Sequence, residues 1–239
     1  MHKVFISPSD QKRNTYAAGN TNEAEVCGKI GAACKTALER CGFAVELVQY
    51  EPMSSKCAKS DAFGAELHLP IHTNAFNGQT SGTRIMCYQM SGEGYKACKA
   101  IFDVLAPLTP GTSENITAHP ELYEIKNANA PTAYVEVDFH DVPSVAEWLI
   151  ANTETIGETI AKGVCSYFGE AYVETAAPQP VSDGRYHTFE EVPDWAKPTV
   201  RELMDANALR GREGDLDLSD DLLRSLVVNK RYAEFLLKQ

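Results

Sequence analysis

Short apolar runs alternate with longer segments of helical period along the first 170 residues. The apolar runs lie at 4–6, 43–48, 66–71, 83–88 and 134–139, and they predict strands because they are short and bounded by turn-forming residues. Between them, apolar positions recur with a helical period at 23–41, 54–63, 95–105 and 143–168. Strands that alternate with helices predict an α/β domain in which a mixed, twisted β-sheet carries helices on both faces.

Turn-forming and polar residues divide the rest of the chain. A polar loop is expected over 111–120, and residues 174–184 contain Ala-Ala-Pro-Gln-Pro, a composition typical of a linker. Helical periods return at 194–207 and 219–237. We therefore expect a main domain over 1–173, a linker over 174–184 and a small helical segment over 185–239. Because so short a segment is marginal as an independent fold, we expect it to pack on the main domain, on a second copy or on a target.

The composition narrows the choice of partners. The net charge of -11 argues against binding to nucleic acid and against a polybasic membrane anchor. No apolar run is long enough to span a bilayer, and the first residues lead directly into a strand, so the sequence predicts synthesis in the cytoplasm without a signal peptide. The seven cysteines include no Cys-x-x-Cys pair, and we expect them to be reduced and mostly buried.

The strongest candidate for chemistry is His72, at the end of the third apolar strand. A histidine in this position directs its imidazole to the edge of the sheet where such folds bind ligands. Two glutamates could join it: Glu23, at the start of the first helical segment, and Glu136, in the middle of an apolar strand. Glu25 is an alternative to Glu23, although the distance to the helix end at Gly42 favours Glu23. A carboxylate in an apolar strand is costly to bury without a partner, which favours a bound metal ion.

The order of these features resembles the zinc-dependent N-acetylmuramoyl-L-alanine amidases that cut peptidoglycan. The resemblance covers about residues 3–168, and the segment 140–148 is similar to the form found in phage and clostridial lysins. It implies a Zn2+ ion held by one glutamate and two histidines. Matched residue by residue, the glutamate is Glu23, the second histidine is His72 and the catalytic glutamate is Glu136, in a Val-Glu-x-x-Phe strand.

The first histidine of the family is replaced in this chain. Where the family reads Asp-Pro-Gly-His-Gly-Gly, residues 7–12 read Ser-Pro-Ser-Asp-Gln-Lys, so Asp10 takes the place of the histidine. Aspartate can bind zinc, and a set of Asp10, Glu23 and His72 leaves a position open for water. This set carries more negative charge than one with two histidines and so admits harder divalent metals more readily. Asp10 is alternatively a turn residue with local hydrogen-bond partners.

The resemblance also implies a reaction. A zinc ion would polarise the carbonyl of the amide between N-acetylmuramic acid and L-alanine and would lower the pKa of its water. Glu136 would then carry the proton from the water to the leaving nitrogen.

Three further residues are candidates for the surroundings of the site. His140 lies four residues after Glu136, roughly 13 Å away along a strand, so we expect it behind the ligands or in the substrate cleft rather than on the ion. Asn127 and Asn129 precede the Glu136 strand and could contact the peptide stem.

The C-terminal segment, with Phe189, Trp195, Val200 and Gly211, resembles part of a surface-layer-homology repeat, a helical module that attaches proteins to wall polymers. Wall binding and dimerisation are both open for it. The leading interpretation is a lytic amidase of the phage or prophage endolysin type, which acts on peptidoglycan at the bacterial wall after release. One alternative is a wall-binding protein with a weakened metal site, which the Asp10 replacement motivates. The other is an intracellular zinc peptidase or deacylase on a similar sheet.

Overall fold

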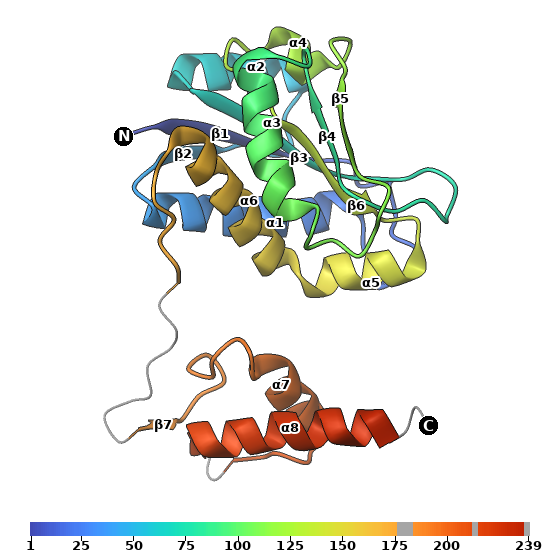
Figure 1. Ribbon diagram of the computed structural model, residues 1–239, viewed down its shortest axis with the longest axis vertical. Helices are drawn as coiled ribbons and strands as arrows, with labels where there is room; N and C mark the ends of the chain where they lie inside the picture. Colours follow the sequence, from blue (N-terminus) through green and yellow to red (C-terminus); the bar gives the residue numbers. More distant parts are fainter. Residues whose placement is uncertain (176–183, 212–214, 237–239) are drawn as a thin grey trace. The chain divides into compact units, whose positions relative to one another are not determined.

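The computed structural model of the chain describes residues 1–175, 184–211 and 215–236 (Figure 1). It divides into two compact units, Met1–Val173 and Glu174–Gln239. Within the described residues, no helix is both long and apolar enough to cross a membrane.

A six-stranded sheet forms the centre of the first unit (Figure 1). Its strands are β1 (Lys3–Pro8), β2 (Ala44–Leu47), β3 (Leu67–Asn74), β4 (Arg84–Cys87), β5 (Asn115–Ala118) and β6 (Tyr134–Phe139). They lie in the order β2-β1-β3-β6-β4-β5. All neighbours are parallel except β4 and β6, which are antiparallel, so the sheet is mixed.

Helices cover both faces of this sheet, which confirms the predicted fold class. They are α1 (Glu23–Arg40), α2 (Met53–Phe63), α3 (Gly92–Leu105), α4 (Tyr123–Asn127), α5 (Pro143–Ala151) and α6 (Thr153–Phe168). On one face α6 packs between α1 and α3, and on the other α2 packs against α4 (Figure 1). Asn22 caps α1, its side-chain Oδ1 accepting from the backbone N–H of Glu25 at 3.1 Å.

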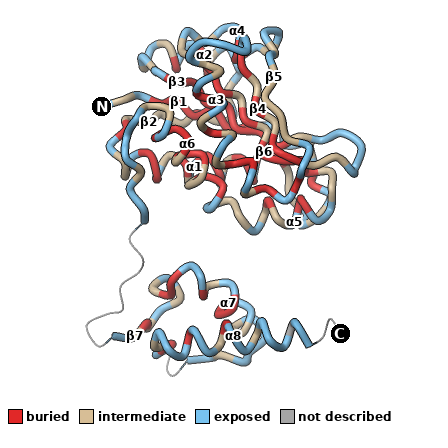
Figure 2. Tube along the Cα trace, viewed as in Figure 1, coloured by how far each residue is buried: buried red, intermediate tan, exposed pale blue. Residues whose placement is uncertain are grey.

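Alternation along the strands separates the core from the polar face of the sheet. In β3, Leu67, Leu69 and Ile71 join the large apolar core with α1, α3 and α6 (Figure 2). The intervening His68 faces α2 and α4 instead, where its ring nitrogens meet Ser60 and Glu124. Because successive side chains of a strand point to opposite faces, the even-numbered positions of β3 carry the chemistry and the odd-numbered ones the packing.

Two glycines allow α6 to approach its neighbours closely. A Cβ at Gly157 would lie 2.6 Å from both the Ala33 Cβ and the Ile30 carbonyl oxygen of α1. A Cβ at Gly163 would lie 2.5 Å from the Ile101 Cα of α3. The three-helix layer therefore depends on the missing side chains at these two positions.

The second unit contains a short strand pair and two helices around a small core. The elements are β7 (Arg185–Tyr186), β8 (Leu218–Ser219), α7 (Lys197–Asp205) and α8 (Asp220–Leu236). The buried residues are Tyr186, Val192, Ala196, Val200, Leu216, Leu218, Leu223 and Val227. On α8, Leu222, Val228, Tyr232 and Phe235 are exposed.

Two predicted elements of the first unit differ in the structure. The expected loop over 111–120 contains β5, which pairs with β4 alone at the sheet edge. The single helix expected over 143–168 is divided into α5 and α6 at Asn152, which has φ -120° and donates from its side-chain amide to the Trp148 carbonyl at 2.8 Å. Most of the predicted linker, 176–183, and the predicted helix end at 237 lie outside the described residues.

All seven cysteines are free in the described part of the chain, and six of them are buried. The expectation that the cysteines are mostly buried is therefore confirmed. A buried thiol behaves as a small apolar side chain.

Candidate active site

The centre of the site is formed where β3 and β6 lie side by side. His72 and Glu136 are register partners in these parallel strands, so their side chains lie next to each other on the same face of the sheet. This is the polar face, opposite to the apolar core. Arg84 of β4 is the register partner of Glu136 on its other side. The sheet thus fixes a histidine, a carboxylate and a guanidinium in one row.

Glu23 reaches this row from the first turn of α1. Its Oε1 accepts from His72 Nδ1 at 2.9 Å, and its Oε2 accepts from Asn14 Nδ2 at 2.6 Å. The backbone N–H of Glu23 also donates to the Asn14 carbonyl at 2.9 Å. Glu23 and His72 are both buried. The structure therefore brings together three of the predicted site residues: Glu23, His72 and Glu136.

Burial and charge act in opposite directions on the Glu23–His72 pair. Burial by itself would raise the pKa of Glu23, but the hydrogen bond and charge of His72, with Asn14, hold that pKa below its ordinary value. Burial would lower the pKa of His72, but the bond to Glu23 and the charges of Glu136 and Glu23 hold it above its ordinary value. Both shifts favour the charged forms, a carboxylate on Glu23 and an imidazolium on His72.

Glu136 is the carboxylate with an unused oxygen. Its Oε2 is enclosed and has no hydrogen-bond partner among the described residues. Burial raises the pKa of Glu136 to about 7, an effect that the His72 charge opposes and the Glu23 charge reinforces. A carboxyl group with this pKa can both take and give a proton near neutral pH.

Asp10 lies in the loop after β1 and has Lys56 as its ion-pair partner. Its side chain is 41% exposed, and its nearest cation is the buried Lys56, with Nζ 3.9 Å from Oδ2. The neighbouring Gln11 does reach the pair: its side-chain Nε2 lies 3.5 Å from His72 Nδ1. Nothing in the sequence pattern signalled Gln11, because the direction of a loop side chain depends on the local turn.

A cavity of about 530 Å3 opens beside these residues. Asp10, Gln11, His72 and Tyr134 line it, together with Lys56 and Glu124 and the segment 50–53. The ring of Tyr134 stacks on that of His72, with centroids 4.6 Å apart. An apolar wall of this kind holds the imidazole in one orientation and keeps water from one of its faces.

Sequence reasoning missed Glu124. This buried residue of α4 accepts from Ser7 Oγ at 2.5 Å and from His68 Nε2 at 3.1 Å. Burial by itself would raise the pKa of Glu124, but the hydrogen bond from His68 and the charge of His68 hold that pKa below its ordinary value. The argument applied to Glu136, a carboxylate between apolar neighbours, also holds for Glu124 between Leu122 and Ile125 and could have found it.

His140 lies behind the row rather than in the cavity. Its Nδ1 lies 2.9 Å from Thr73 Oγ1, and its ring stacks on Tyr16 with centroids 4.9 Å apart. Burial lowers its pKa. The side chain of Thr73 also bonds to the Tyr16 hydroxyl at 2.9 Å, so these three residues brace the end of β3 next to His72.

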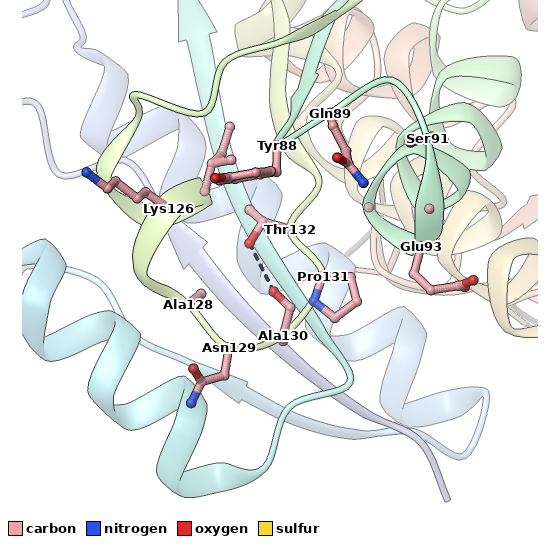
Figure 3. Close-up of a pocket in the computed structure, with 13 residues that line it drawn as sticks. Tyr88, Gln89, Ser91, Glu93, Lys126, Ala128, Asn129, Ala130, Pro131 and Thr132 are labelled. Atoms are coloured by element: carbon pink, nitrogen blue, oxygen red, sulfur yellow. Dashed lines mark hydrogen bonds between the residues drawn. The ribbon is translucent and has the colours of Figure 1, made fainter.

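Asn127 and Asn129 lie apart from the row. Asn127 donates to the Tyr123 carbonyl at 2.8 Å within its own helix. Asn129 lines a second cavity of about 320 Å3 with Tyr88 and Lys126 (Figure 3). Both asparagines are exposed.

The donor atoms around the pair supply part of the coordination shell of a divalent ion. Over 1–175, 184–211 and 215–236, no three His, Cys, Asp or Glu side chains converge as metal ligands. Two observations nevertheless fit a cation: Glu23 and His72 present an oxygen and a nitrogen at 2.9 Å, and the unused Glu136 Oε2 lies on the neighbouring strand. Glu23 and His72 therefore suit a metal as two of its ligands.

Comparison with known proteins identifies the fold and the family. The family profile of N-acetylmuramoyl-L-alanine amidases matches residues 4–166. The catalytic domain of CwlV, an N-acetylmuramoyl-L-alanine amidase from Bacillus (Paenibacillus) polymyxa var. colistinus, is similar in structure with a TM-score of 0.65 and 14% identity over 72% of this chain and 100% of that one. An N-acetylmuramoyl-L-alanine amidase from Clostridium difficile 630 gives a TM-score of 0.62 and 18% identity over 70% and 97% of the two chains.

A third similar structure is the catalytic domain of the CD27L endolysin targeting Clostridia difficile, with a TM-score of 0.56 and 20% identity over 70% of this chain and 98% of that one. No curated protein matches the chain closely enough to count as a relative. Since the family profile covers well over half of its length, this chain belongs to the N-acetylmuramoyl-L-alanine amidase family.

Proposed function

We propose that this protein hydrolyses the amide bond between N-acetylmuramic acid and L-alanine in peptidoglycan, and that it does so with a divalent metal, Zn2+ in the first place. Membership of the amidase family supports the assignment of this amide as the bond that is cleaved. The observation that carries the mechanism is the carboxyl group of Glu136, which has one unused oxygen and is the register partner of His72, the residue that pairs with Glu23.

Glu23 and His72 would hold the ion, with a third donor from the loop after β1, where Asp10 occupies the position of the family's first histidine. A bound zinc ion supplies an acidified water and polarises the scissile carbonyl. Glu136 takes a proton on Oε2 as the nucleophile attacks and gives it to the leaving nitrogen as the C–N bond breaks. A pKa of about 7 suits Glu136 for both steps.

The remaining residues position the reactants. Tyr134 fixes the imidazole plane of His72 by stacking. Lys56 is a buried cation in the wall of the same cavity and would attract a carboxylate or carbonyl oxygen of the peptide stem. Asn127 and Asn129 remain predictions for contacts with the stem farther from the reacting bond.

The test uses purified bacterial walls with added Zn2+. The protein should reduce wall turbidity and release new L-alanine amino termini without new reducing sugar ends. Glu136→Gln should lower the rate about 10²- to 10⁴-fold, because the proton carrier is removed. Glu147→Gln, on the exposed side of α5, is the matched control and should retain the parent rate. Full lysis by Glu136→Gln, or by protein stripped of metal, would sink the proposal.

The biological setting we propose is that of an endolysin of phage or prophage type acting at the bacterial wall, with residues 185–239 as a wall-binding or dimerising segment. Sedimentation of walls with the full chain and with a chain ending at 173 compares their binding, and light scattering reports their mass. Equal binding and equal oligomeric state of the two proteins would exclude both roles for the segment.

A second candidate function is wall binding with little or no hydrolysis. It is favoured by one observation: the Asp10 carboxylate lies toward Lys56 rather than toward Glu23 and His72. This function predicts that the zinc-loaded protein co-sediments with walls and releases no L-alanine termini.

A further inference from the structure

The loop after β1 gives two neighbouring side chains, Asp10 and Gln11, different partners. Its backbone is held in place: the Ser9 N–H donates to the Ile71 carbonyl at 2.9 Å, and the Lys12 N–H donates to the Asp10 carbonyl at 2.9 Å. With the backbone fixed, the Asp10 carboxylate lies 3.9 Å from Lys56 Nζ, while the Gln11 side-chain Nε2 lies 3.5 Å from His72 Nδ1. The residue that contacts the buried pair is therefore Gln11.

Gln11 belongs to a hydrogen-bonded network with both members of the pair. Asn14 Nδ2 donates to Gln11 Oε1 at 2.9 Å and to Glu23 Oε2 at 2.6 Å. Asn14 therefore ties the amide of Gln11 to the carboxylate that accepts from His72. Gln11 comes from a loop, Glu23 from a helix and His72 from a strand, and hydrogen bonds and contacts join their side chains.

The contact between Gln11 and His72 is not satisfied as a hydrogen bond. Nδ1 of His72 donates to Glu23, so it has no lone pair to accept from Gln11 Nε2, and two nitrogen atoms face each other at 3.5 Å. The oxygen and nitrogen of a glutamine amide have the same shape, so a half-turn of the amide places its oxygen toward His72 and gives up the hydrogen bond from Asn14 to Gln11 Oε1. A cation bound by this oxygen, by Glu23 and by deprotonated Nδ1 removes the conflict.

We propose that Gln11, through its side-chain carbonyl oxygen, is the third metal donor with Glu23 and His72, and that Asp10 is not a ligand. This deepens the proposed function and rests on its assignment of a metal to Glu23 and His72. The set of one carboxylate, one imidazole and one neutral amide carries a single negative charge, whereas a set with Asp10 would carry two. A bound water is more acidic on the less negative site, which favours hydrolysis near neutral pH.

Metal binding by the full chain tests the proposal without reference to activity. Zn2+ affinity is measured by competition with a chromogenic chelator, and the coordination sphere is read from the visible absorption of the Co2+ form. The parent should bind one ion per chain. Gln11→Ala should weaken Zn2+ binding at least about tenfold, whereas Asp10→Ala, one residue away in the same loop, should change it less than about threefold. Gln11→His should tighten binding and change the Co2+ spectrum.

Two outcomes would overturn the proposal: Asp10→Ala loses the metal while Gln11→Ala keeps it, or the parent binds no Zn2+. Equal thermal midpoints of the two variants in a chelator show that both are folded, and Glu23→Gln serves as the variant that removes a shared ligand. The proposed hydrolysis fails separately: zinc bound through Gln11 with no release of L-alanine termini from walls would reject the hydrolysis and leave the metal site standing.

Discussion

Replacing Glu136 by glutamine should stabilise the metal-free protein relative to its parent, and increasingly so as the pH rises. The pKa of Glu136 is about 7 in the folded protein against an ordinary value of 4.5. Between these values the folded state binds more protons than the unfolded state, so the free energy of unfolding of the parent falls as the pH rises. Glutamine cannot ionise, so the variant does not show this loss.

The magnitude follows from the difference between the two pKa values. At 1.36 kcal/mol per pKa unit, about 7 against 4.5 corresponds to about 3 kcal/mol. The residue Glu136 is partly exposed, so solvent screening reduces this figure. We expect the stability difference between variant and parent to grow by about 1 to 3 kcal/mol from pH 5 to pH 9.

The assay is urea unfolding in a chelator, with both proteins in a Trp195→Phe background so that fluorescence reports Trp148 of the first unit. Glu147→Gln, measured in parallel, should keep a constant difference from the parent across the pH range. The reasoning is refuted if the difference between Glu136→Gln and the parent is flat or falls with pH. A flat difference would mean that the Glu136 carboxylate is as well solvated in the folded chain as in the unfolded one.

Three further predictions concern the rest of the first unit. Gly157→Ala should lower the free energy of unfolding by about 1 to 3 kcal/mol, because the new methyl group meets the backbone of α1. The control Ser166→Ala, on the exposed side of α6, should change it by less than about 0.5 kcal/mol. Equal urea midpoints of the two variants would contradict the close packing. Glu124→Ala should cost about 3 to 5 kcal/mol by leaving His68 and Ser7 without an acceptor, and Glu124→Gln should cost less; the reverse order would show that the pair is not needed. The coupling energy between Glu23 and His72 is measured in the presence of a chelator by a double-mutant cycle of Glu23→Gln and His72→Ala, and it should be largest between pH 4.5 and 6.5. Below this range the coupling is lost because the Glu23 carboxylate is protonated, and above it the coupling is lost because the pH passes the raised pKa of His72. A coupling that increases up to pH 9 would contradict the ion pair.

The fold could be predicted from the sequence wherever a segment has one strong period. The strands β3 and β6 and the helix α1 are of this kind, because their apolar residues face a single large core. The strand β5 was missed, since Asn115, Ile116 and Thr117 give no clear period at a sheet edge with one partner. The break between α5 and α6 was missed because the apolar pattern continues through Asn152, whose side chain binds the backbone locally.

The site residues that lie on regular elements could also be predicted, whereas those in a loop could not. His72, Glu23 and Glu136 could be placed together because each is a polar residue in or next to an apolar element, and the topology of such a sheet then fixes their positions. The contribution of the loop after β1 could not be predicted, since the local turn decides whether residue 10 or residue 11 contacts His72. Glu124 was within reach of the same reasoning, whereas its partners His68 and Ser7 required the register of β1 and β3.

The even and odd positions of β3 have a consequence for how such a protein can change over time. His72 and its register partner cannot move to an adjacent position without turning the apolar side chains of the same strand into water. The donor supplied by the loop after β1 is under no such restriction, because Asp10 and Gln11 are both exposed and neither belongs to the core. Of the residues around the pair, those of this loop can therefore be exchanged with little loss of folding stability. We therefore expect the metal preference of related chains to diverge first at this loop, while the strand residues stay the same.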